Sequence, residues 1–148
     1  MDYVAYFKFG TTAPKPRGEW DVVAQSICVA GIEKHGREVR AFCRAVERAE
    51  AEKRPYGLTL VRQPHLRGTT EAIAVYGFAE GKRLFGTARR RWHIGYLPGI
   101  VARKVDPGGT HKSEELGAEL QAIYSGLGDF CEIRMSLLVP RLAMRMAA

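Results

Sequence analysis

The chain has 148 residues, of which 46% are hydrophobic, and this length accommodates one buried core rather than two substantial domains. Its 23 Lys and Arg residues against 16 Asp and Glu residues give a net charge of +7, which favours polyanionic partners such as nucleic acid or acidic membrane surfaces, and charge alone does not choose between them. Because no run of about 18 apolar residues occurs, the sequence excludes a membrane-spanning helix.

The N-terminal third predicts two strands and one helix. Tyr3 to Phe9 has the aromatic and aliphatic pattern of a strand, and the segment 10–18, which is rich in Pro and Gly, ends it. Ile27 to Ala30 is short, apolar and partly β-branched, as in a buried strand. Apolar residues recur at helical spacing between Arg37 and Lys53, so this segment predicts a helix that ends before Pro55.

The middle of the chain predicts four strands. Their bounds are Gly57–Arg62, Ala72–Tyr76, Leu84–Thr87 and Arg91–Leu97. A polar loop that begins at Pro64 separates the first two, and the glycines between Gly77 and Gly81 predict a turn before the third. The basic run Arg89–Arg91 then lies between the last two strands.

The C-terminal third predicts two helices and a strand. Pro98 suits the first turn of a short helix that continues through Lys104. Ser113 is a good N-cap for a second helix, which Gly126 ends. The apolar stripe of that second helix consists of Leu116, Leu120, Ile123 and Tyr124. Apolar residues alternate with polar ones from Cys131 to Leu137, as in a strand with one buried face.

Four pieces of this pattern are similar to a HIRAN domain. They are Val29-Ala30-Gly31-Ile32, Leu60-Val61-Arg62-Gln63-Pro64, Ala72-Ile73-Ala74-Val75-Tyr76 and Ile94-Gly95-Tyr96-Leu97-Pro98. The resemblance implies a mainly β domain, an OB- or SH3-like β-barrel with two or three peripheral α-helices, of the stand-alone bacterial or phage type. It divides the chain into an N-terminal strand and loop extension (1–25), the HIRAN-like barrel (26–141) and a C-terminal tail (142–148).

The HIRAN resemblance also implies binding to DNA ends, and one loop departs from the family pattern. Where the family has Asn-Pro-Tyr-Asp near a bound 3′ end, this chain has Leu66, Arg67, Gly68 and Thr69. The amide, ring and carboxylate are all replaced. We therefore expect weakened specificity for a 3′ end.

Proteins that bind single strands on barrels combine cationic side chains with rings on which bases stack. Candidates for this role are Arg62, His65, Arg67, Arg89, Arg91, Trp92, His93 and Tyr96. Strand alternation places Arg89, Arg91 and His93 on one face. Other interpretations are a solvated hairpin tip for the arginines, core packing for Trp92, simple packing for Tyr96 and an ordinary loop residue for His65.

The sequence shows no catalytic motif. The four histidines are scattered without the close pairing of a metal site, there is no phosphate-binding Gly-x-x-x-x-Gly-Lys motif, and we expect no cofactor. The primary hypothesis is a non-catalytic domain that binds single-stranded DNA, serves DNA repair and acts with a helicase or nuclease, without a membrane partner. The alternatives are a protein-interaction or scaffold domain of the same fold and, third, a small hydrolase.

The cysteines and the start of the sequence bear on location. Cys28, Cys43 and Cys131 are odd in number, lie far apart in apolar stretches and form no Cys-x-x-Cys pair, which is typical of buried thiols in a reducing compartment. The first residues lack the basic region and cleavage site of a secretory signal. We therefore expect a cytoplasmic protein.

Overall fold

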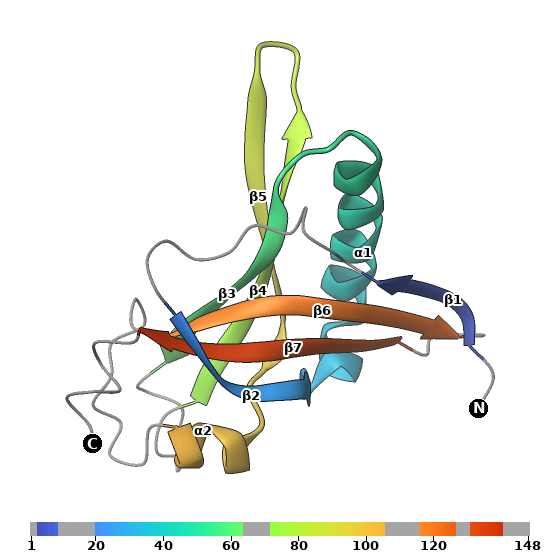
Figure 1. Ribbon diagram of the computed structural model, residues 1–148. Helices are drawn as coiled ribbons and strands as arrows, with labels where there is room; N and C mark the ends of the chain where they lie inside the picture. Colours follow the sequence, from blue (N-terminus) through green and yellow to red (C-terminus); the bar gives the residue numbers. More distant parts are fainter. Residues whose placement is uncertain (1–2, 9–19, 64–71, 106–115, 127–130, 141–148) are drawn as a thin grey trace.

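One antiparallel sheet dominates the computed structural model, which describes residues 3–8, 20–63, 72–105, 116–126 and 131–140 (Figure 1). Six strands lie in the order β2-β7-β6-β3-β4-β5, and β1 pairs with the second half of β6. The strands are β1 (Tyr3–Lys8), β2 (Trp20–Cys28), β3 (Tyr56–Gln63), β4 (Ala72–Lys82), β5 (Thr87–Tyr96), β6 (Gly117–Gly126) and β7 (Cys131–Pro140). The prediction of a mainly β fold is confirmed.

Helix α1 (Gly36–Ala51) packs against β4 and β5 and confirms the helix predicted for this segment. Its buried residues are Val39, Phe42, Val46 and Ala49. A Cβ atom on Gly77 of β4 would lie 2.5 Å from the Phe42 ring, so glycine lets the helix approach the strand closely. A 3-10 helix, η1 (Ile32–His35), precedes α1, and the predicted short helix after Pro98 is α2 (Gly99–Val105).

The buried core joins both halves of the sheet. The apolar phases of three strands predict that Leu58, Leu60, Ile73, Val75, Ile133 and Met135 share one core. All six belong to a single cluster, together with the buried face of α1. This confirms that the central strands and β7 lie in one folding unit.

The second helix predicted in the C-terminal third is wrong, because Gly117–Gly126 forms strand β6. Leu116, Leu120 and Ile123 have helical spacing, but the register of β6 against β7 shifts between Leu120 and Ala122. Such a bulge changes the phase of a strand by one residue. Apolar residues on both sides of it therefore acquire spacings of four and three, which resemble those of a helix.

The predicted hairpin in the middle of the chain is displaced. Strand β4 continues through the expected turn to Lys82, and the actual turn lies at residues 83–86. The basic run Arg89–Arg91 is consequently in the interior of β5 and not at a hairpin tip. Gly77 and Gly81 indicated a turn, but Gly77 serves the packing of α1 and the turn itself contains Gly86, whose φ is 83°.

Two features of the N-terminal strands differ from the expected pattern. β2 begins at Trp20, so the predicted boundary after residue 25 falls within this strand, and β1 belongs to the same sheet. Cys28 is exposed, and Cys43 and Cys131 are only partly buried, so the expectation of three buried thiols is wrong. Among the helices that the structure describes, none has the length and apolar character needed to cross a membrane.

Backbone hydrogen bonds connect the segment after β2 to the end of β5. The N–H of Ala30 donates to the carbonyl of Tyr96, and the N–H of Tyr96 donates to the carbonyl of Ala30, both at 2.8 Å. A Cβ atom on Gly95 would lie 2.3 Å from the Ala30 carbonyl oxygen, so this approach requires glycine. The bridge brings the segment that leads into η1 against β5.

Candidate nucleic-acid interface

The hairpin of β4 and β5 carries aromatic and basic side chains on the side away from α1. Its register places Tyr76 opposite His93, Phe78 opposite Arg91, and Glu80 opposite Arg89. Residues directly opposite each other in an antiparallel pair share a face. We call this surface the cationic face and define it as His35, Tyr76, Phe78, Arg89, Arg91, His93 and Tyr96.

Two arginines of the cationic face lie on aromatic rings. The guanidinium carbon of Arg89 lies 4.5 Å from the centroid of the Phe78 ring, and that of Arg91 lies 4.6 Å from the centroid of Tyr76. Both arginines are exposed, and Phe78 is buried. A ring beneath a guanidinium restricts its orientation while leaving its N–H groups available to solvent or to an anionic ligand.

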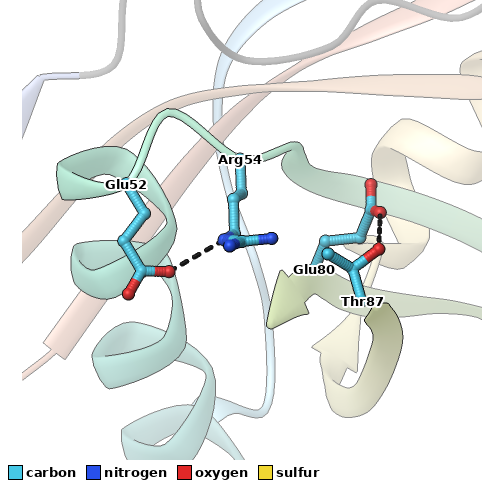
Figure 2. Close-up of polar contacts among 4 residues, drawn as sticks. All are labelled: Glu52, Arg54, Glu80 and Thr87. Carbon is cyan, nitrogen blue, oxygen red and sulfur yellow. Dashed lines mark hydrogen bonds and ion pairs between the residues drawn. The ribbon is translucent and has the colours of Figure 1, made fainter. Parts of the chain in front are cut away.

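The two arginines differ in their nearby acids. Arg89 lies 3.8 Å from Glu80. Figure 2 shows the hydrogen bond that Glu80 also accepts from Thr87, at 3.2 Å. Within the described parts of the chain, no carboxylate forms an ion pair with Arg91. Arg91 therefore carries the less neutralised charge of the two.

The base of the hairpin is fixed to the rest of the domain. The N–H of Glu80 donates to the carbonyl of Pro55 at 2.9 Å, just before β3 begins. Nearby, Arg54 and Glu52 form an ion pair at 2.8 Å beyond the end of α1 (Figure 2). The hairpin that carries the cationic face is thus hydrogen-bonded to the rest of the domain at Glu80, which provides a rigid support for a binding surface.

A bulge in β5 adds Tyr96 to the cationic face. The pairing of β5 with β4 shifts between Val75 and Tyr76, so that Ile94 has no direct partner and is buried. Simple alternation would place Tyr96 on the opposite side from His93, but the bulge reverses the phase. The rings of His93 and Tyr96 consequently meet edge to face, with centroids 4.9 Å apart.

His35, at the end of η1, completes the ring cluster from outside the sheet. Its ring centroid lies 4.4 Å from that of His93 and 5.9 Å from that of Tyr96. On the other side, His93 stacks on Tyr76 with centroids 4.9 Å apart and an angle of 16° between the rings. Four rings from three elements therefore form one continuous cluster next to Arg91.

The surroundings of His93 favour its neutral form. Burial and the charge of His35 lower the pKa of His93 below its ordinary value of 6.5, and the Gly95 carbonyl and Glu38 oppose this shift. Its Nε2–H donates to that carbonyl at 3.0 Å. The cluster thus holds an uncharged imidazole at neutral pH, which suits stacking.

The lowered pKa predicts a pH-dependent stability. Below about pH 6.5 the unfolded chain binds a proton at His93 that the folded chain resists, so the free energy of unfolding should fall as the pH decreases through this range. We expect His93→Gln to show a shallower decrease than the wild type in urea titrations at several pH values. Because His35 and Glu38 are present in both proteins, the difference between the two pH dependences reports on His93 alone. Parallel curves would contradict the lowered pKa of His93.

The predicted site residues separate into three groups. Arg89, Arg91, His93 and Tyr96 come together on the cationic face, as described above. Trp92 points to the other side of β5, with its ring centroid 6.1 Å from that of Phe42, and it packs against the core. Arg62 has the same strand phase as Leu58 and Leu60, so alternation places it on the core side, away from the cationic face.

The remaining two candidates, His65 and Arg67, lie outside the described residues, and so do Leu66, Gly68 and Thr69. Of the four candidate arginines, Arg62, Arg67, Arg89 and Arg91, the cationic face therefore contains Arg89 and Arg91. Sequence reasoning missed Tyr76, Phe78 and His35 as site residues. Strand pairing could have suggested Tyr76, because it lies across from the Arg-Trp-His segment, whereas no local signal indicated His35.

Comparisons with protein-family models, curated proteins and solved structures found no match to this chain. The HIRAN resemblance therefore stays a prediction. In the described segments, no group of three or more His, Cys, Asp and Glu side chains is placed to hold a metal ion. The case for a function depends on the geometry of the cationic face.

Proposed function

We propose that this protein binds single-stranded nucleic acid, DNA in particular, along the cationic face. The observation that carries the proposal is the stacking of Arg89 and Arg91 on Phe78 and Tyr76. A guanidinium that is already oriented loses little freedom on binding, and its fork of N–H groups suits phosphate oxygens. Side chains two residues apart on one strand face are separated by roughly 7 Å, a distance comparable to that between neighbouring phosphates in an extended strand.

The ring cluster supports a preference for single strands. Bases that are free of a duplex can stack on aromatic side chains, with about 1–3 kcal/mol for each base. Tyr96, His93 and His35 lie at one end of the arginine row, where a strand bound to Arg91 would next bring its bases. In a duplex, base pairing hides these base faces, so the cluster would not contribute.

The HIRAN resemblance supports the same proposal at the level of the fold. We propose that the sheet curves into an OB- or SH3-like barrel, for which the reciprocal hydrogen bonds between Ala30 and Tyr96 provide support, because they link the segment after β2 to the last strand of the order. Binding is non-catalytic in this proposal. A helicase or nuclease partner in the cytoplasm would supply the chemistry, in DNA repair.

Titration of fluorescent oligonucleotides at two salt concentrations tests the proposal. We expect the wild type to bind a single strand about tenfold more tightly than the matching duplex, and more weakly at higher salt. Absence of binding to both would remove nucleic acid as the ligand and favour the protein-interaction alternative. A competitor blocked by a 3′-phosphate should compete as well as one with a free 3′-hydroxyl, because the loop 66–69 lacks the family's end-binding residues.

Replacing the ring beneath Arg91 gives a sharper prediction. Tyr76→Ala removes the support for the guanidinium and one ring of the cluster, and we expect single-strand affinity to fall about tenfold, or 1.4 kcal/mol. Tyr76→Phe keeps the ring and should bind within about twofold of the wild type. Anisotropy titrations measure both, and thermal unfolding confirms that each variant is folded. Equal losses in the two variants would show that the hydroxyl matters and not the ring.

A further inference from the structure

The tip of the β4–β5 hairpin exposes two large apolar side chains. Leu84 is 92% exposed and Phe85 is 91% exposed. The turn is nevertheless closed, because the N–H of Arg83 donates to the carbonyl of Gly86 at 2.9 Å and Gly86 adopts a φ of 83°. The sequence therefore presents an apolar pair on an ordered turn, where exposure to water is unfavourable unless a ligand covers it.

The hairpin projects beyond its neighbours in the sheet. Pairing of β4 with β3 ends at Tyr56 and Ala79, whereas pairing with β5 continues to Lys82 and Thr87 (Figure 1). In the same view the tip extends past the end of α1. We call this projecting hairpin of β4 and β5 the arm. Its end is a two-stranded ribbon that can reach into a ligand.

The tip is continuous with the cationic face. Phe85 precedes Arg89 by four residues and Arg91 by six, so they lie at most roughly 13 and 20 Å apart along the chain. Lys82 and Arg83 add exposed positive charge directly beside the apolar pair. A polyanion that follows Arg91 and Arg89 along the arm therefore arrives at Leu84 and Phe85.

We propose that Leu84 and Phe85 form a wedge that enters the base stack where a single strand meets a duplex. Proteins that distort nucleic acid insert Phe, Leu and similar side chains between bases, while basic groups hold the adjacent phosphates. Here Lys82 and Arg83 hold phosphates at the junction, and the cationic face holds the single-stranded tail. The inference rests on the proposed function and adds a substrate class, a forked or tailed duplex.

The distribution of charge favours this ligand over a lipid surface. An arm that inserts its tip into a bilayer would use basic residues around the tip, at the level of the headgroups. In this protein the stacked arginines continue along one side of the arm, away from the tip, to the ring cluster. A flat membrane in contact with the tip would leave them unused, whereas a strand lying along the arm contacts both regions.

A forked duplex with 2-aminopurine at the junction tests the wedge. Wild-type protein should raise the fluorescence of the unstacked base about threefold, whereas Leu84→Ser/Phe85→Ser should leave it near the free-fork value. Both side chains are exposed, so the serine variant should fold normally. It should bind an isolated single strand within about twofold of the wild type, since the cationic face is unchanged. Phe85→Trp, which keeps an apolar ring, should retain the fluorescence rise.

The outcomes separate the wedge from the proposed function. If wild-type protein fails to bind the isolated strand, the proposed function fails and the wedge with it. If the strand binds but the serine variant raises fluorescence as the wild type does, the wedge alone is overturned. Vesicles of phosphatidylserine and phosphatidylcholine provide a third test. Binding to vesicles that depends on Leu84 and Phe85, without a rise in 2-aminopurine fluorescence at the fork, would assign the tip to membranes.

Discussion

Reversing the charges of Arg89 and Arg91 together will weaken single-strand binding by about 100-fold, which corresponds to 2.7 kcal/mol. In the proposed function, Arg89→Glu/Arg91→Glu removes two phosphate contacts, and it places two repulsive carboxylates on the same strand face. The slope of log affinity against log salt should become shallower by about 1.4, or 0.7 for each lost contact. The loss should be similar for different base sequences, because phosphates are common to all of them.

A control of equal charge distinguishes a local site from a general effect of net charge. Arg90 lies between the two tested residues but on the opposite side of β5, with its guanidinium carbon 5.4 Å from the centroid of Trp92. Arg44 is exposed on α1, which covers that same side. Arg44→Glu/Arg90→Glu changes the charge by the same amount and should cost less than about fivefold in affinity. Equal losses in the two double variants would locate binding elsewhere.

Local sequence patterns were sufficient to predict the elements in which a regular apolar period coincides with the buried face. The helical spacing of Val39, Phe42 and Val46 predicted α1, and the alternation of Ile133 and Met135 predicted β7. In both segments the apolar period is uninterrupted, so sequence periodicity and packing agree.

Two bulges account for much of what the sequence could not reveal. One, between Leu120 and Ala122 in β6, produced a false helical period, and the other, beside Ile94 in β5, moved Tyr96 to the face of His93. Each depends on how a strand pairs with its neighbour, which no single segment encodes. Strand alternation did correctly group Arg89 with Arg91, because they precede the bulge.

The ring cluster could not be assembled from sequence because its members come from separate elements. His35 meets His93 where the bridge of Ala30 to Tyr96 and the packing of α1 on β5 bring segments far apart in the chain together. Trp92 was an ambiguous candidate because its sequence neighbours and its packing neighbours suggest different roles. Its neighbours are basic, but the position of α1 makes it part of the core side.

The bridge of Ala30 to Tyr96 depends on Gly95, and Gly95→Ala should be among the most destabilising small substitutions in this chain. The new Cβ would lie 2.3 Å from the Ala30 carbonyl oxygen and 2.7 Å from Val29 Cγ1. A backbone atom cannot rotate away as a side chain can, so both reciprocal hydrogen bonds must lengthen or break. We expect a loss of about 2–4 kcal/mol in the free energy of unfolding, measured by urea denaturation.

Gly81→Ala is the matched control, because a Cβ there has no neighbour within 4 Å, and it should change the stability by less than about 0.5 kcal/mol. Folded Gly95→Ala protein should also lose single-strand affinity, since separating Ala30 from Tyr96 withdraws His35 from the ring cluster. Unchanged stability would mean that the bridge tolerates the extra methyl group. A loss of stability without a loss of affinity would instead show that binding does not depend on the bridge, and would favour a site on the hairpin of β4 and β5.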